Sequence, residues 1–127
     1  MTFYNQTVKK MSDRLYRNSY QTDRAIRARK FIDKNFDKLI FLDTIASAVF
    51  CSKFHLNREF KRHYGMTPSK YLTDKRVSEA KKILLDNGSV TDACFSVGYE
   101  SLSTFSLLFR RMTGKNAGNF RKARIKK

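Results

Sequence analysis

The fold is decided by residues 45 to 71, which read IASAVFCSKFHLNREFKRHYGMTPSKY. Residues 93 to 120, which read ACFSVGYESLSTFSLLFRRMTGKNAGNF, follow the same outline. In both stretches apolar residues recur at intervals of three and four, the spacing of one face of an α-helix. Each also has a serine able to cap a helix and, further on, a glycine able to end it. The chain therefore carries two copies of one short helical unit.

The two copies differ in length at one place. Before it, matching residues are 48 apart, as Ala46 and Cys94 are; after it, they are 49 apart, as Phe60 and Phe109 are. One copy has gained a residue inside the turn between its helices. Two helices joined by a short turn form a helix-turn-helix, whose second helix enters the major groove of DNA. The repeat predicts two similar surfaces in one chain.

The composition favours a polyanionic partner. Lys and Arg number 27 against 11 Asp and Glu, which gives a net charge of +16 on 127 residues. Nucleic acid is the first candidate and an anionic membrane the second. The chain has no apolar run of about 18 residues and no signal peptide at its N-terminus, so we expect no membrane partner and a cytoplasmic location. A hydrophobic content of 41% argues against a disordered basic tail.

Residues that carry catalytic or metal chemistry are sparse. The residue types that bind zinc are present at Cys51, His55, His63 and Cys94. However, the two histidines are eight residues apart on one expected helix, roughly 12 Å, too far to share a tetrahedral ion. We therefore expect no metal, no cofactor, and two buried or half-buried thiols. No phosphate-binding loop, paired carboxylates or nucleophile with a base appears, so an enzyme is not expected.

The chain is expected to be all-α, because it has only 5 Gly and 1 Pro and no clear strand. Caps and apolar spacing predict seven helices, at about residues 22–36, 44–50, 53–64, 68–86, 90–97, 102–112 and 116–124. They form two helix-turn-helix subdomains joined by a long linker helix. The predicted divisions are an N-terminal arm or additional helix, the first subdomain, the linker helix and the second subdomain, at residues 1–21, 22–66, 67–87 and 88–127.

The second helix of the first unit has a flank suited to base edges. Leu56, Phe60 and Tyr64 have core spacing. The opposite flank then carries Lys53, Phe54, Asn57, Arg58 and Lys61. Arginine can bond the O6 and N7 of guanine, asparagine can bond adenine, and a phenyl ring can pack on the methyl group of thymine. The alternative is an ordinary solvated basic face.

The corresponding flank of the second unit has fewer long polar side chains. It carries Leu102, Ser103, Thr104, Ser106, Leu107 and Arg110. Hydroxyl groups can bond several bases and leucine can meet thymine, so discrimination here is expected to be weaker or to depend on DNA shape. The alternative for Leu102 and Leu107 is packing at the edge of the core or against the N-terminal segment, and for Leu102 the two interpretations are equal.

The linker suggests how one chain can reach two grooves. At about 1.5 Å per residue, residues 68–86 give a rod of roughly 28 Å. Successive major grooves on one face of DNA are about 34 Å apart. We therefore expect binding as a monomer to an asymmetric DNA site.

These residues resemble the DNA-binding domain of the AraC/XylS family of bacterial transcription regulators, over about residues 25 to 123. The matching positions are Ile45-Ala46, Ser52 to Leu56, Arg58, Phe60-Lys61, Gly65 to Tyr71, Arg76-Val77, Ala80, Ile83-Leu84, Val90 to Ser101, Phe105-Ser106, Phe109-Arg110 and Thr113-Gly114. The resemblance implies seven helices in two subdomains, recognition helices in adjacent major grooves, and contact with RNA polymerase.

The resemblance also assigns the base-reading positions and the regulatory class. In the first unit it implies Phe54, Asn57 and Arg58. In the second it implies Leu102, Ser103, Thr104, Ser106 and Leu107. Because no effector domain is present, the chain is similar either to short stand-alone activators or to an excised DNA-binding domain. A non-specific packaging or RNA-binding protein is the alternative function, which the charge alone would allow.

Three residues depart from the family pattern. Phe50 stands where the first turn usually has glycine, which predicts a rebuilt turn with Phe50 buried. Leu107 stands where the second helix commonly has arginine, which predicts weak base readout there. Ala117 replaces the proline that matches Pro68, which affects only the start of the last helix.

Overall fold

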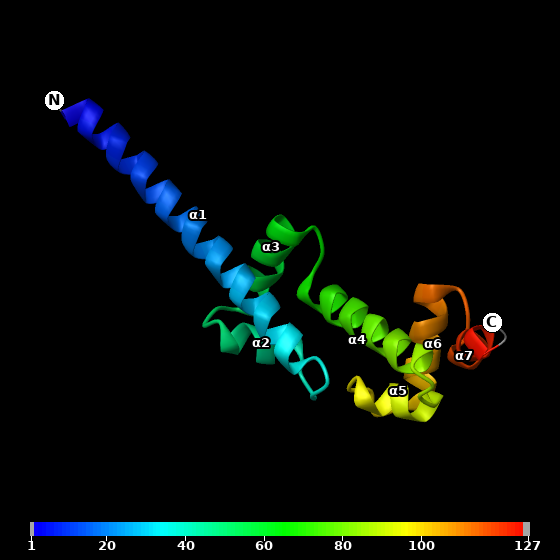
Figure 1. Cartoon of the computed structure of the whole chain (residues 1–127). Coiled ribbons are helices and arrows are strands. Elements are labelled where there is room, and N and C mark those ends of the chain that lie inside the picture. Colours follow the sequence, from blue (N-terminus) through cyan, green and yellow to red (C-terminus); the bar gives the residue numbers. More distant parts are fainter. Residues whose placement is uncertain (1, 126–127) are drawn as a thin grey trace. The chain divides into compact units, whose positions relative to one another are not determined.

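The computed structural model describes residues 2–125, with side chains at 7–12, 14–15 and 21–121, and it is helical throughout (Figure 1). The helices are α1 (Thr2–Asn35), α2 (Leu42–Ala48), α3 (Lys53–Tyr64), α4 (Pro68–Leu85), α5 (Val90–Ser96), α6 (Leu102–Thr113) and α7 (Ala117–Ile125). The described residues contain no strand. The predicted all-α class is therefore confirmed, and each helix from α2 onward lies close to its predicted position.

The first helix is longer than the sequence reading predicted. Instead of beginning at Thr22, α1 runs without a break from Thr2, so most of the segment left open as an arm or a helix is helical. The first 35 residues contain neither Gly nor Pro, so nothing ends a helix there. Among the described side chains of α1, the buried ones lie in its second half, at Ala25, Ala28 and Ile32. The N-terminal half of α1 extends beyond α2 and α3 (Figure 1).

The chain divides into two compact units. The first contains α1 up to Phe31 together with Leu42–Pro68, and the second contains Ile32–Phe41 and the chain from Ser69 onward. Residues 67–87, predicted as a separate linker, are thus mostly grouped with the second unit. Among the described residues of the first unit, the buried apolar side chains are Ala25, Ala28, Ile45, Ala46, Val49, Leu56, Phe60 and Pro68.

The linker helix joins the second unit because its inner face is part of that unit's core. Val77, Ala80 and Leu84 of α4 pack with buried residues of α5, α6 and α7. Those partners are Ala93, Cys94, Val97, Phe105, Phe109 and Ala117. A helix that contributes this much apolar surface is not an isolated rod.

Arg76 attaches the end of α1 to α4. Its Nε donates to the carbonyl of Phe36 at 2.7 Å, and its Nη2 donates to that of Lys38 at 2.9 Å. The guanidinium also lies 5.2 Å from the centre of the Tyr99 ring. These contacts satisfy carbonyl groups at a helix end, where intrahelical donors are lacking. They explain why residues 32–41 belong to the second unit.

The two turns have the same hydrogen bonds. The amide of Cys51 donates to the carbonyl of Ala46 at 3.1 Å, and the amide of Tyr99 donates to that of Cys94 at 3.1 Å. The serines that cap the next helices lie one and two residues further on, so the second turn holds the additional residue, Glu100. The predicted insertion is confirmed.

Phe50 corrects one prediction. The first turn is not rebuilt: Phe50 takes the left-handed conformation, with φ of 58°, that Gly98 takes with φ of 99° in the second turn. Its side chain is 82% exposed and not buried. The hydrogen bonds of the turn fix the backbone in this left-handed conformation. For a residue with a β-carbon, the conformation has a steric cost of about 1 to 2 kcal/mol.

We expect Phe50→Gly to stabilise the chain by about 0.5 to 1 kcal/mol, because glycine relieves that strain but adds unfolded-state entropy. Gly98→Ala is the matched control in the second turn and should destabilise, since the added Cβ would lie 2.9 Å from the carbonyl oxygen of Phe36. Urea unfolding of both variants measures the changes. A loss of stability in Phe50→Gly would show that the exposed ring contributes more than the strain costs.

Candidate nucleic-acid interface

Both ends of α3 are fixed by local hydrogen bonds. Ser52 is extended, and its Oγ accepts from the amide of His55 at 3.2 Å. At the other end Gly65 is left-handed, with φ of 77°, and its amide donates to the carbonyl of Lys61 at 2.8 Å. These are the N-cap and C-cap that the sequence predicted. These caps set the first and last residues of α3 and therefore the extent of its outward-facing surface.

The ends of α6 are fixed in the same way. The Oγ of Ser101 accepts from the amide of Thr104 at 3.3 Å. Gly114 has φ of 79°, and its amide donates to the carbonyl of Arg110 at 2.9 Å. The two presented helices therefore share their caps and their length of 12 residues.

The inner face of α3 is buried, which turns the predicted flank outward. Leu56 and Phe60 are fully buried. Of the five predicted site residues of this helix, four are exposed and Asn57 is half-buried; the exposed ones are Lys53, Phe54, Arg58 and Lys61. Phe54 is 69% exposed, and the Nζ atom of Lys53 lies 5.6 Å from the centre of its ring.

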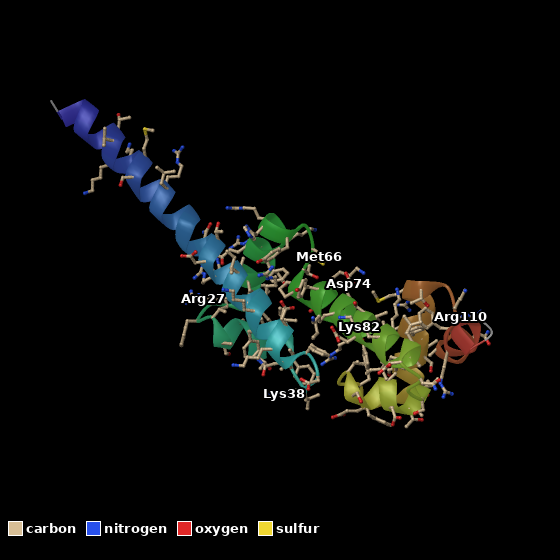
Figure 2. The ribbon with its side chains drawn as sticks, viewed as in Figure 1. Arg27, Lys38, Met66, Asp74, Lys82 and Arg110 are labelled. Carbon is tan, nitrogen blue, oxygen red and sulfur yellow. The ribbon has the colours of Figure 1, made fainter. Side chains whose placement is uncertain are left out.

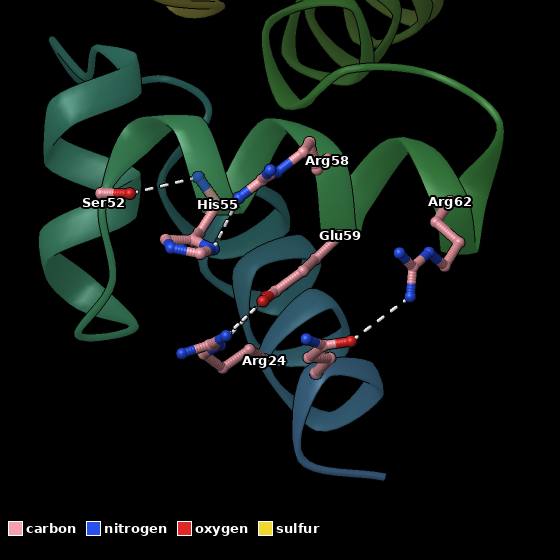
Figure 3. Close-up of polar contacts among 7 residues, drawn as sticks. Arg24, Ser52, His55, Arg58, Glu59 and Arg62 are labelled. Atoms are coloured by element: carbon pink, nitrogen blue, oxygen red, sulfur yellow. Dashed lines mark hydrogen bonds and ion pairs between the residues drawn. The ribbon is translucent and has the colours of Figure 1, made fainter. Parts of the chain in front are cut away.

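An ion pair holds α3 against α1. The Arg24 guanidinium donates through Nε to Glu59 Oε2 at 3.0 Å and through Nη2 to Glu59 Oε1, a forked contact (Figure 3). Glu59 is the only charged side chain that is buried among the described residues. One turn further on, Arg62 donates to the Gln21 side chain at 3.4 Å. No sequence pattern indicates this pair, because its members are 35 residues apart.

The α6 flank is also directed outward. Phe105 and Phe109 are fully buried on its inner face. Every predicted site residue of this helix is exposed: Leu102, Ser103, Thr104, Ser106, Leu107 and Arg110. Figure 2 labels Arg110 on this helix. Leu107 is 67% exposed and Leu102 is 41% exposed.

The two flanks match position by position. Adding 49 to each site residue of α3 gives a site residue of α6. The resulting pairs are Lys53 and Leu102, Phe54 and Ser103, Asn57 and Ser106, Arg58 and Leu107, and Lys61 and Arg110. Three of the five α3 residues are cations, against one in α6. The same surface is thus presented twice with different chemistry.

His55 was considered in the sequence as a metal ligand and as a position matching the family pattern, and the structure shows a contact that neither predicted. Its Nδ1 lies 3.0 Å from Arg58 Nη2 (Figure 3). Residues three apart on a helix are neighbours, so the spacing was visible, but the choice of side-chain conformations was not. No group of three or more His, Cys, Asp or Glu side chains in the described part of the chain could hold a metal ion.

The two cysteines are free thiols, with Cys94 buried and Cys51 half-buried, as predicted. Burial raises the pKa of both thiols above their ordinary value. They therefore stay protonated and poorly reactive at neutral pH. Within residues 2–125, no helix has the length and apolar character needed to cross a membrane.

The sequence profile of a family described as a helix-turn-helix domain matches residues 45–123. The chain is 34% identical over 93 residues, 72% of its length, to the "bifunctional transcriptional activator/DNA repair enzyme AdaA" of Bacillus subtilis. It is 35% identical over 83 residues, 65% of its length, to the "probable transcription factor PqrA" of Proteus vulgaris. The chain belongs to the AraC/XylS family of transcription regulators.

A solved AraC/XylS-type structure also agrees with the fold. The C-terminal domain of AraT, a response regulator from Geobacillus stearothermophilus, superposes with a TM-score of 0.77 at 27% identity. The superposition covers 80% of this chain and 85% of that domain. The matched region corresponds to only 44% of AdaA but to 68% of PqrA. The family match therefore concerns the helix-turn-helix region that carries α3 and α6.

Proposed function

We propose that the chain binds double-stranded DNA in a sequence-specific manner as a monomer, with α3 and α6 in successive major grooves. The observation that carries this proposal is the repeated presentation of two equally long, equally capped helices with position-matched outward flanks. A helix of this kind fits the major groove, where each base pair has a distinct pattern of donors and acceptors. A net charge of +16 provides the attraction to phosphate.

Within this proposal the two helices have unequal roles. Phe54, Asn57 and Arg58 supply the stronger base readout, with Lys53 and Lys61 at the phosphates or groove edge. The α6 flank reads less, because its equivalents of Asn57 and Arg58 are Ser106 and Leu107. Hydroxyl groups discriminate among bases less sharply than a forked arginine does.

The regulatory role is activation of transcription in the cytoplasm, with contact to RNA polymerase. AdaA, whose helix-turn-helix region is similar, has activator in its name. Its name also includes DNA repair, but we propose no enzymatic activity for the region shared with this chain. The feature that favours regulation over general packaging is the uneven chemistry of the two flanks.

The test is competition binding. A labelled duplex, selected by the chain from a random-sequence library, is titrated and then challenged with unrelated duplex and with RNA. Sequence-specific binding predicts that typically a thousandfold or greater excess of unrelated duplex is needed for displacement. Equal displacement by all competitors would support the packaging or RNA-binding alternative.

Arg58→Ala should weaken binding to the selected duplex by about 1 to 3 kcal/mol and relax the preference at one base pair, because a forked arginine contact gives that discrimination. Leu107→Ala, the matched position in α6, should cost less. Equilibrium titration with the selected duplex and its single-base variants measures both. If Arg58→Ala lowers specific and non-specific binding alike, Arg58 contacts phosphate and does not read a base.

A further inference from the structure

The contact between His55 and Arg58 has a defined polarity. Arginine is always protonated and can only donate, so the atom that accepts at 3.0 Å is His55 Nδ1. This hydrogen bond requires the tautomer of His55 that carries its proton on Nε2. His55 is itself fixed in the first turn of α3, because its amide is bonded to the Ser52 side chain at 3.2 Å. The acceptor that Arg58 contacts thus belongs to a residue whose backbone is fixed by the N-cap of the helix.

The contact leaves the arginine able to bind a base. A guanidinium has five N–H donors, and the bond to His55 uses one of them. A forked contact to guanine needs two. Both His55 and Arg58 are exposed on α3, so neither side chain packs in the core of the unit. The bond therefore restricts the arginine without burying it.

We propose that His55 is a positioning residue that holds Arg58 in the orientation from which it reads its base. This inference rests on the proposed function, since it needs Arg58 to contact a base edge. Immobilising a long side chain on binding has an entropic cost that lowers the affinity of the complex. A side chain that is ordered before binding avoids that cost. The hydrogen bond to His55, within the same turn of the helix, orders the Arg58 side chain before DNA is bound.

The second unit has no equivalent of the contact between His55 and Arg58. The positions that match His55 and Arg58 by the interval of 49 are Thr104 and Leu107. Leucine has no donor for a hydrogen bond, so a contact of this kind cannot form there. Thr104 is bonded through its amide to Ser101, just as His55 is to Ser52. The contact between a histidine and an arginine is therefore present in α3 and has no counterpart in α6.

The experiment combines His55→Ala, His55→Asn, Arg58→Ala and the double variant His55→Ala/Arg58→Ala. Each is titrated with the duplex selected by the wild-type chain, with its single-base variants and with unrelated duplex. We expect His55→Ala to weaken binding to the selected duplex about threefold to tenfold and to relax the preference at the base pair read by Arg58. Asparagine places a carbonyl oxygen near the position of Nδ1, so His55→Asn should largely restore that preference.

The double variant separates positioning from direct contact. If His55 acts through Arg58, removing it in the Arg58→Ala background should have no further effect on specificity. A His55→Ala effect that persists in that background, or that lowers binding to all duplexes alike, would show instead that His55 contacts phosphate.

The two hypotheses fail in different ways. If Arg58→Ala does not change base preference, the proposed function of Arg58 is wrong, and the positioning role falls with it. If Arg58→Ala relaxes the preference and His55→Ala does not, Arg58 reads the base without help, and only the positioning role is wrong. Circular dichroism of each variant confirms that α-helix content is kept.

Discussion

Arg24→Ala is expected to lower the free energy of unfolding of the first unit by about 3 to 5 kcal/mol, because it leaves the carboxylate of Glu59 buried without its partner. The Arg24 side chain is 14% exposed and the Glu59 side chain 5% exposed. An isolated buried charge is much more costly than an exposed one, since water cannot solvate it. The loss should appear at α3, on which Glu59 lies.

Hydrogen exchange measures this loss separately for each unit. The amides of α3 should lose protection in Arg24→Ala, and those of α6, which lies in the other unit, should change much less. Lys82→Ala is the control for an exposed pair, because Lys82 is 69% exposed where it contacts Glu79 at 3.1 Å. It should cost no more than about 1 kcal/mol.

Replacing both members of the pair tests the mechanism. Arg24→Met with Glu59→Leu removes both charges and keeps apolar volume, so stability should return to near the wild-type value or exceed it. DNA binding by this double variant shows whether the pair also orients α3. Equal losses for Arg24→Ala and Lys82→Ala would mean that solvent reaches Glu59, contrary to its burial.

Local rules predicted most of the helix boundaries. Ser52, Gly65, Ser101 and Gly114 cap their helices where the sequence placed them, because each satisfies backbone groups within a few residues. Phe50 was misjudged for the opposite reason. Its left-handed conformation is imposed by the hydrogen bonds of the turn, which outweigh the preference of the residue itself.

Helical periodicity was enough to predict which side chains of the candidate site face outward. Burial of Leu56 and Phe60 is enough to direct Arg58 outward, and the sequence contains that spacing. Contacts made across the fold or by side-chain conformation were missed. The Arg24 to Glu59 pair joins two helices, and the His55 to Arg58 contact depends on how two long side chains are turned.

Inserting five base pairs between the two half-sites of the selected duplex is expected to reduce affinity at least about a hundredfold, which corresponds to loss of two or more base contacts of about 1 to 3 kcal/mol each. Five base pairs are about half a turn of DNA, so the second major groove moves to the opposite side of the duplex. In the proposed function, α4, which is continuous over 18 residues or about 27 Å and belongs to the same unit as α6, sets the reach of α6, and the rotated groove lies outside that reach.

Two further duplexes make this result specific to the second unit. Replacing the second half-site with unrelated sequence should give nearly the same affinity as the insertion, since in both cases α3 alone reads bases. An insertion of ten base pairs restores the face of the DNA but adds about 34 Å to the separation, so it should not restore binding. Single mismatches in the first half-site should cost more than those in the second, because Asn57 and Arg58 have only Ser106 and Leu107 as counterparts. Full affinity for the duplex with the five-base-pair insertion would mean that α6 does not read DNA, and that Leu102 and Leu107 belong to a protein contact.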